Sequence, residues 1–114
     1  MKKLLTMVVL GAAATVAQAQ ETGNVDAARD KVAMCIGCHG IPGYRASFPE
    51  VYQVPMLGGQ SAKYIENALK SYQKGDRKHP TMRGIADSLS DKDIVAVAAY
   101  YSQQKAGTTN NPLK

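Results

Sequence analysis

The sequence has little of the material from which a small domain usually builds its core. It contains no tryptophan, one phenylalanine (Phe48) and only two cysteines among 114 residues. A small domain buries a limited apolar interior, and several disulfides or a bound group usually make up the difference. Two cysteines allow at most one disulfide, so we expect a bound group.

Long hydrophobic runs are absent beyond the N-terminus. Residues 1–19, MKKLLTMVVLGAAATVAQA, begin with two lysines, continue with an uncharged apolar stretch and end in small residues. This layout is typical of a secretory signal peptide, and its apolar part is too short for a comfortable membrane span. We therefore predict that residues 1–19 are removed, that residues 20–114 form one domain without stable membrane insertion, and that this domain is exported.

Strong charge of either sign is also absent. The formal net charge is +5, and loss of Lys2 and Lys3 with the signal peptide leaves about +3. Export and this low charge disfavour a nucleic-acid partner. The basic cluster between residues 63 and 83 is either a solvated helix face or a surface that steers an acidic partner. It consists of Lys63, Lys70, Lys74, Arg77, Lys78 and Arg83.

Helical periodicity predicts an all-α domain with long loops. The first helix is expected over residues 25–35 and runs into the cysteine segment. A second helix is expected to begin after Ser61 and to stop at Gly75, and the last to begin at Ser90 with Asp93 completing a capping box. The expected inward-facing residues are Ala27, Ala28, Val32, Tyr64, Ile65, Ala68, Leu69, Tyr72, Ile94, Val97, Ala98 and Tyr101, with Tyr100 beside them.

The segments between these helices carry the loop signals. Residues 40–59 are interrupted by glycines and prolines, and such a long irregular segment suggests that it wraps around something functional. Residues 76–89 predict a loop with a short helical turn. No sheet-forming stretch is apparent in the sequence.

Both cysteines and one of the two histidines lie in the segment MCIGCHG, between Cys35 and His39. A disulfide-exchange pair usually sits at the N-terminus of a helix, after a strand, whereas this pair follows a predicted helix. A structural zinc site needs four ligands, and His79 is the only further histidine. Both alternatives are therefore disfavoured.

Covalent haem attachment explains the same spacing. Two thiols three residues apart can add to the two vinyl groups of one porphyrin, and the histidine that follows is then held beneath the iron. We predict one haem c attached through Cys35 and Cys38, with His39 as an iron ligand.

The other face of the iron decides between electron transfer and the binding of gases or peroxide. Met82 is the favoured second ligand because it lies in a predicted loop, and residues 80–84 do not form a helical core stripe. Core packing is the alternative role for Met82, and His79 is the alternative ligand. Met34 adjoins the first cysteine and cannot reach across, while Met56 is expected on the histidine side.

The sequence resembles class I cytochromes c of the small bacterial periplasmic monohaem kind, over essentially the whole chain after the signal peptide. The resemblance is carried by four motifs in order: CIGCHG, VPMLGGQ at 54–60, YIENALKSYQKGDR at 64–77 and HPTMRGIADSLSDKDIVAVAAYYS at 79–102. It implies the cytochrome c fold, with about four short helices and long loops around one haem. It also implies His39 and Met82 as proximal and distal ligands, and export to the periplasm of a Gram-negative bacterium.

Further residues gain roles from this resemblance. The carbonyl of Pro55 would accept the proximal imidazole N–H, and Leu57 would pack on the haem. The last helix would cross the first, where Ala27 and Ala28 allow close approach. The segment 40–54 departs from the commonest relatives in being longer, and its candidates for the haem propionates or for a partner surface are Tyr44, Arg45 and Tyr52.

The function expected is electron transfer without enzymatic activity. The iron would cycle between its ferrous and ferric states, and redox partners would dock transiently at the haem edge. The alternative is a dedicated haem subunit of a periplasmic dehydrogenase or a sulfur-compound-oxidising complex. We expect a monomer or a subunit of a small complex.

Overall fold

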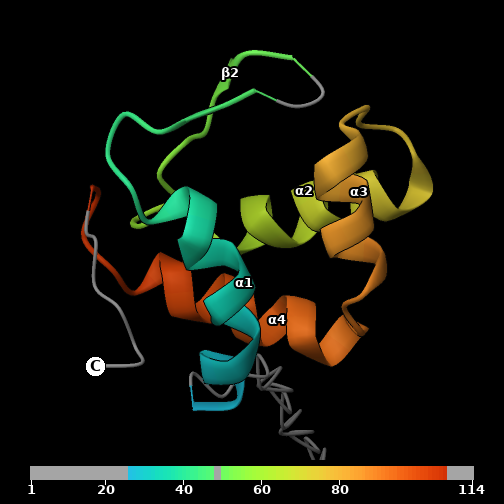
Figure 1. Cartoon of the computed structure of the whole chain (residues 1–114). Helices are drawn as coiled ribbons and strands as arrows, with labels where there is room; N and C mark the ends of the chain where they lie inside the picture. Colours follow the sequence, from blue (N-terminus) through green and yellow to red (C-terminus); the bar gives the residue numbers. More distant parts are fainter. Residues whose placement is uncertain (1–25, 48–49, 108–114) are drawn as a thin grey trace, which may run out of the picture.

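The computed structural model describes residues 26–47 and 50–107, and four α-helices dominate them (Figure 1). The all-α prediction is therefore confirmed. The predicted signal peptide and Phe48 lie outside the described residues. The elements are a 3-10 turn (Asp26–Ala28), α1 (Arg29–His39), β1 (Arg45–Ala46), β2 (Tyr52–Gln53), α2 (Ala62–Lys74), α3 (Pro80–Asp87) and α4 (Asp91–Ser102).

Helix α1 is longer at its C-terminal end than its sequence pattern suggested. The predicted end near Cys35 is wrong, because the helix continues through both cysteines to His39. The helical hydrogen bonds close at Gly40, whose N–H donates to the Ile36 carbonyl at 2.9 Å. A Cβ at Gly40 would lie 2.7 Å from that oxygen, so this end requires glycine.

Helix α2 begins and ends where its capping residues predict, and α4 begins where its capping box predicts. The Ser61 hydroxyl accepts the Tyr64 N–H at 3.1 Å, and Gly75 ends α2 in the left-handed conformation, with φ of 83°. At α4 the Ser90 and Asp93 side chains each accept the backbone N–H of the other, which is the predicted capping box.

The segment between α2 and α4 contains a full helix where only a turn was expected. Helix α3 runs for eight residues, so Met82 lies in its first turn and not in a loop. Pro80 occupies the first helical position, which suits its fixed φ, and His79 serves as N-cap. Histidine is not among the usual capping residues, and Gly84 weakens the helical pattern.

Residues 40–59 also contain a short pairing that the sequence did not predict. Arg45 pairs with Gln53 and Ala46 with Tyr52 in an antiparallel ladder. In Figure 1 this loop arches over the end of α1 on the side away from α4.

The core lies where α1, α2 and α4 meet (Figure 1). Ile94, Val32 and Val97 are its largest fully buried side chains. Ala28 is also fully buried and packs near α4, whereas Ala27 is exposed, so only one of the two predicted alanines serves the close approach. None of the helices in the described part of the chain is both long and apolar enough to cross a membrane.

Candidate functional site

A cavity of about 290 Å³ lies between α1, α2, α3 and the loop that follows β2. Its walls are mainly apolar, and α2 contributes Ile65, Ala68 and Leu69. All six residues predicted from the sequence to hold or contact haem line this one cavity. They are Cys35, Cys38, His39, Pro55, Leu57 and Met82.

The two cysteines are free thiols on the last turns of α1. The Cys35 thiol is buried and donates to the Lys31 carbonyl at 3.7 Å, while Cys38 is exposed. Burial raises the pKa of Cys35 to about 11, and the C-terminal end of a helix disfavours a thiolate. A thiol whose pKa is raised in this way is unsuited to disulfide exchange.

His39 is held at the end of α1 by a contact with the loop after β2. Its Nδ1 lies 2.6 Å from the Pro55 carbonyl oxygen. A carbonyl only accepts, so Nδ1 carries the proton and Nε2 keeps its lone pair for a metal. Burial lowers the pKa of His39, and this outweighs the opposing effect of the Pro55 hydrogen bond. The imidazole is thus neutral, the form that binds metals.

Met82 reaches the same cavity from a different wall. Its side chain is partly buried and packs against the core, and Ile85 and Leu89 follow it along the cavity at helical spacing. The residues that flank Met82 are exposed, so the expectation that they form no core stripe is confirmed, although they lie in a helix and not in a loop. Leu57 also packs against the core from the loop after β2.

His79, the alternative ligand, has a structural task. Its Nδ1 accepts the Met82 N–H at 3.3 Å, which caps the helix that carries Met82. The imidazole also meets the rings of Tyr52 and Tyr72 edge to face, at centroid distances of 5.6 and 6.5 Å. Among the described residues, no group of three His, Cys, Asp or Glu side chains could hold a metal ion.

The rim of the cavity contains a residue that sequence reasoning placed only in the basic cluster. Arg77 lines the cavity, and its guanidinium carbon lies 4.9 Å from the centroid of the Tyr72 ring. A hydrogen bond to Tyr64 raises the pKa of Arg77. Tyr64 was expected to face inward, but it is 51% exposed at this rim. The sequence signal that could have indicated this position is that Arg77 comes two residues after Gly75, which ends the second helix.

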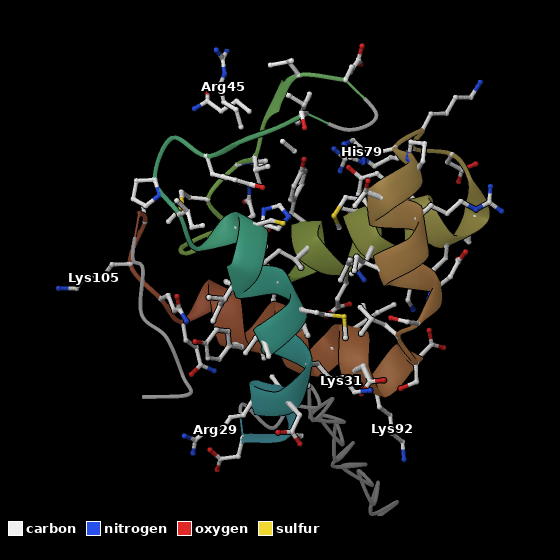
Figure 2. The ribbon with its side chains drawn as sticks, viewed as in Figure 1. Arg29, Lys31, Arg45, His79, Lys92 and Lys105 are labelled. Carbon is white, nitrogen blue, oxygen red and sulfur yellow. The ribbon has the colours of Figure 1, made fainter. Side chains whose placement is uncertain are left out.

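Of the three residues of the segment 40–54 that were predicted to contact haem propionates or a partner, only one lines the cavity. Tyr52 lines the cavity, whereas Tyr44 and Arg45 are not among its lining residues, and Arg45 points away from the helices in Figure 2.

Three members of the basic cluster form ion pairs with acidic side chains. These pairs are Lys63 with Glu66 at 3.9 Å, Lys70 with Asp91 at 3.6 Å and Arg83 with Asp87 at 3.7 Å.

The chemistry of the lining residues fits a covalently attached haem. A haem is a flat, largely apolar ring with two carboxylates and an iron. The cavity offers apolar walls, two thiols on one helix, an imidazole nitrogen free for a metal, a thioether and a guanidinium at the rim. Each feature of the group therefore has a counterpart in the site.

Comparisons with known proteins agree with this chemistry. Residues 26–105 match the family described as Cytochrome c. The chain belongs to the cytochrome c family. As a member of that family it is an electron-transfer protein, and it carries one covalently bound haem c.

Several relatives within the cytochrome c family differ from this chain in length. Cytochrome c-554(548) of Halomonas halodenitrificans is 42% identical over 73% of this chain and 99% of its own length. Cytochrome c4 of Stutzerimonas stutzeri is 34% identical over 92% of this chain, which spans only 52% of it. A crystal structure of reduced cytochrome c4 from Pseudomonas stutzeri shares 35% identity, with a TM-score of 0.49, over 62% of this chain and 38% of that one.

Proposed function

We propose that the protein is a periplasmic electron carrier that keeps the haem iron six-coordinate, with His39 and Met82 as axial ligands and Cys35 and Cys38 as the attachment points. The observation that carries this proposal is that all four side chains line one cavity, with the His39 Nδ1–H tied to the Pro55 carbonyl. When bound, the haem supplies an iron that accepts and releases one electron.

The chain's own residues hold this site in one arrangement. The Pro55 carbonyl orients the His39 ring and would leave Nε2 for the haem iron, as partners beyond the ligands commonly do. Leu57 and the α2 side chains Ile65 and Leu69 supply apolar packing that excludes water. If His39 and Met82 held the iron, no position on it would be left for a substrate, so we propose no enzymatic activity.

A redox titration followed by absorption spectroscopy tests this proposal. We expect a single reversible one-electron transition, and we expect the reduced protein to bind carbon monoxide only slowly and weakly. Rapid carbon monoxide binding would contradict a protein-filled sixth position and would favour an open, gas-binding iron.

Export is part of the proposal and is supported by the layout of residues 1–19. Haem attachment and signal removal are both covalent, so the intact mass of the mature protein tests them together. We expect a chain that begins at Gln20 and carries one haem. A mass that includes Met1 would contradict cleavage.

A second candidate function is suggested by the names of two relatives. Proteins called thiosulfate dehydrogenase electron acceptor, from Thiomonas intermedia and Stutzerimonas stutzeri, are 31% and 38% identical to this chain. The same haem site would then serve one dehydrogenase as a dedicated acceptor or subunit. Co-purification with an enzyme at high salt would favour this candidate, whereas dissociation at high salt would favour a diffusible carrier.

A further inference from the structure

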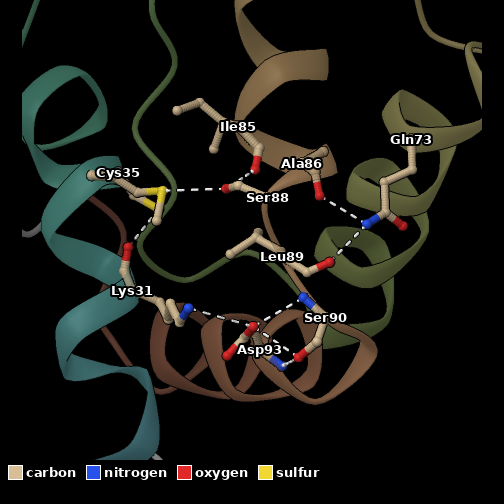
Figure 3. A network of polar contacts seen from close by, with 10 residues as sticks. Lys31, Cys35, Gln73, Ile85, Ala86, Ser88, Leu89, Ser90 and Asp93 are labelled. Carbon is tan, nitrogen blue, oxygen red and sulfur yellow. Dashed lines mark hydrogen bonds and ion pairs between the residues drawn. The ribbon is translucent and has the colours of Figure 1, made fainter.

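Helix α3 is short, and side chains from outside its hydrogen-bonded body hold both of its ends. At the N-terminal end His79 accepts the Met82 N–H. At the C-terminal end the Gln73 side chain, which comes from α2, donates to the Ala86 carbonyl at 2.8 Å and to the Leu89 carbonyl at 2.9 Å. Figure 3 shows the Gln73 amide nitrogen aimed at both oxygens.

This double contact lies where the helix most needs support. Helices shorter than about 12 residues are marginal on their own in water, and α3 has eight residues. The Ala86 carbonyl also accepts the Leu89 N–H at 3.0 Å, so the Gln73 donor adds a second partner there and matters most for the Leu89 carbonyl, which follows the helix. The Gln73 amide supplies one donor group to two of the carbonyls that end α3 and lead into α4.

The face of α3 that these contacts orient is the face toward the cavity. Met82, Ile85 and Leu89 line the cavity, while Ala86 is fully buried. A shift of the C-terminal end of α3 relative to α2 would therefore move the Met82 side chain relative to the cavity. Gln73 does not itself line the cavity, so its amide acts there through the backbone that it binds, at the end of α3 and at Leu89.

We propose that Gln73 is a positioning residue for Met82, and that its two hydrogen bonds keep the Met82 thioether on the iron. This inference rests on the proposed function, in which Met82 is an axial ligand. It predicts that loss of the Gln73 donors opens the Met82 position more often, without a change in the ligands themselves.

Imidazole binding to the oxidised holoprotein measures this opening, because imidazole competes with Met82 for the iron and its apparent affinity scales with the fraction of open sites. Gln73→Leu removes the donors and keeps the bulk of the side chain, and Gln73→Glu keeps the shape but replaces the amide by a carboxylate. For both variants we expect imidazole affinity to rise roughly tenfold, the effect of leaving one buried polar group unpaired. Amides of α3 should also exchange with solvent faster.

Asn67→Leu is the matched control. It makes the same kind of amide-to-leucine change on the same helix, but Asn67 is exposed and does not line the cavity. We expect wild-type imidazole affinity and wild-type exchange of α3 amides. If neither Gln73 variant accumulates as a haem protein, exchange of the Gln73 side-chain amide in the wild type decides, and free exchange there would overturn the proposal.

The variant Met82→Ala distinguishes failure of the proposed ligand role of Met82 from failure of the proposed positioning role of Gln73. If Met82→Ala binds imidazole no more tightly than wild type, Met82 is not a ligand and the proposed function fails. If Met82→Ala binds imidazole far more tightly, but Gln73→Leu and Gln73→Glu behave as wild type, only the positioning role of Gln73 is wrong.

Discussion

The Tyr101 hydroxyl is buried beside the Cys35 sulfur and has no hydrogen-bond partner of good geometry among the described residues. A buried donor without a partner costs stability, while the ring itself packs in the core. We expect Tyr101→Phe to leave the free energy of unfolding unchanged or to raise it by up to about 1 kcal/mol. Urea denaturation of the holoprotein measures this.

Tyr101→Ala is the control for the ring. It should lower the free energy of unfolding by roughly 3–5 kcal/mol, as loss of a buried aromatic ring does. A loss larger than about 1.5 kcal/mol in Tyr101→Phe would show that the hydroxyl makes a stabilising hydrogen bond in the haem-bound protein.

Single residues of the site differ in how far the sequence reveals them. Cys35, Cys38 and His39 are adjacent in the chain, so their local spacing already indicates that they share one site. Met82 is far from them in the chain, and it was predicted because Met34 and Met56 are poorly placed to reach the iron face opposite His39. Arg77 was missed because its place at the rim depends on the turn at Gly75 and on stacking against Tyr72, neither of which is a local pattern.

At the scale of elements, two glycines at α2 and α3 should respond in opposite directions to the same substitution. Gly75 ends α2 with φ of 83°, where an alanine is strained. Gly84 lies inside α3, and an added Cβ would meet nothing within 4 Å. We expect Gly75→Ala to lower stability by about 1 kcal/mol and Gly84→Ala to raise it by about as much.

Thermal unfolding of the two holoproteins provides the measurement. The midpoints should move apart, with Gly84→Ala above wild type and Gly75→Ala below it. A lower midpoint for Gly84→Ala would show that α3 needs the freedom of glycine at this position.

The capping box of α4 makes part of the stability depend on pH. Hydrogen bonds from the Ser90 backbone and hydroxyl lower the pKa of Asp93 below its ordinary value of 3.8. A pKa that is lower in the folded state means that this stabilisation is present above the unfolded pKa and is lost as pH falls through the folded one. The holoprotein should therefore lose stability below about pH 4.

Asp93→Asn tests this contribution, because asparagine cannot titrate in this range. We expect urea midpoints of Asp93→Asn to fall less than those of wild type between pH 7 and about pH 3. Ser90→Ala should cost about 1 kcal/mol at neutral pH, the usual effect of losing an N-cap. Equal acid sensitivity in Asp93→Asn and wild type would contradict the role of Asp93.

Elements were predictable where ordinary caps mark them. Both ends of α2 were predicted correctly from Ser61 and Gly75, and the start of α4 from Ser90. Helix α3 was underestimated because a histidine caps it and Gly84 interrupts it. The strand pair β1–β2 was missed because two-residue strands leave no periodicity to detect.

At the scale of the whole molecule, position and not total charge should decide how an acidic partner docks. Lys78 lies with Arg77 and His79 on an open depression that shares several residues with the haem cavity. Lys92 lies at the start of α4, at the opposite end of the view in Figure 2 from His79. Both lysines carry the same charge, so replacing either by glutamine changes the net charge equally.

We expect Lys78→Gln to lower the bimolecular rate of electron exchange with an acidic partner by roughly twofold to fivefold at low salt, and Lys92→Gln to change it little. Stopped-flow kinetics over a range of ionic strength measures both. Equal effects of the two substitutions would show that the partner docks elsewhere or responds only to net charge.

Side chains from α1, α2, α3 and the loop after β2 line the cavity. Helix α4 packs below these elements in Figure 1. We propose that Met82 would hold the haem iron on the side opposite His39. The weak thioether-to-iron charge-transfer absorption of the oxidised protein reports this bond directly. We predict that Met82→Ala abolishes the band and that Met56→Ala, which removes another thioether lining the same cavity, preserves it. An unchanged band in Met82→Ala would show that Met82 is not a ligand of the iron.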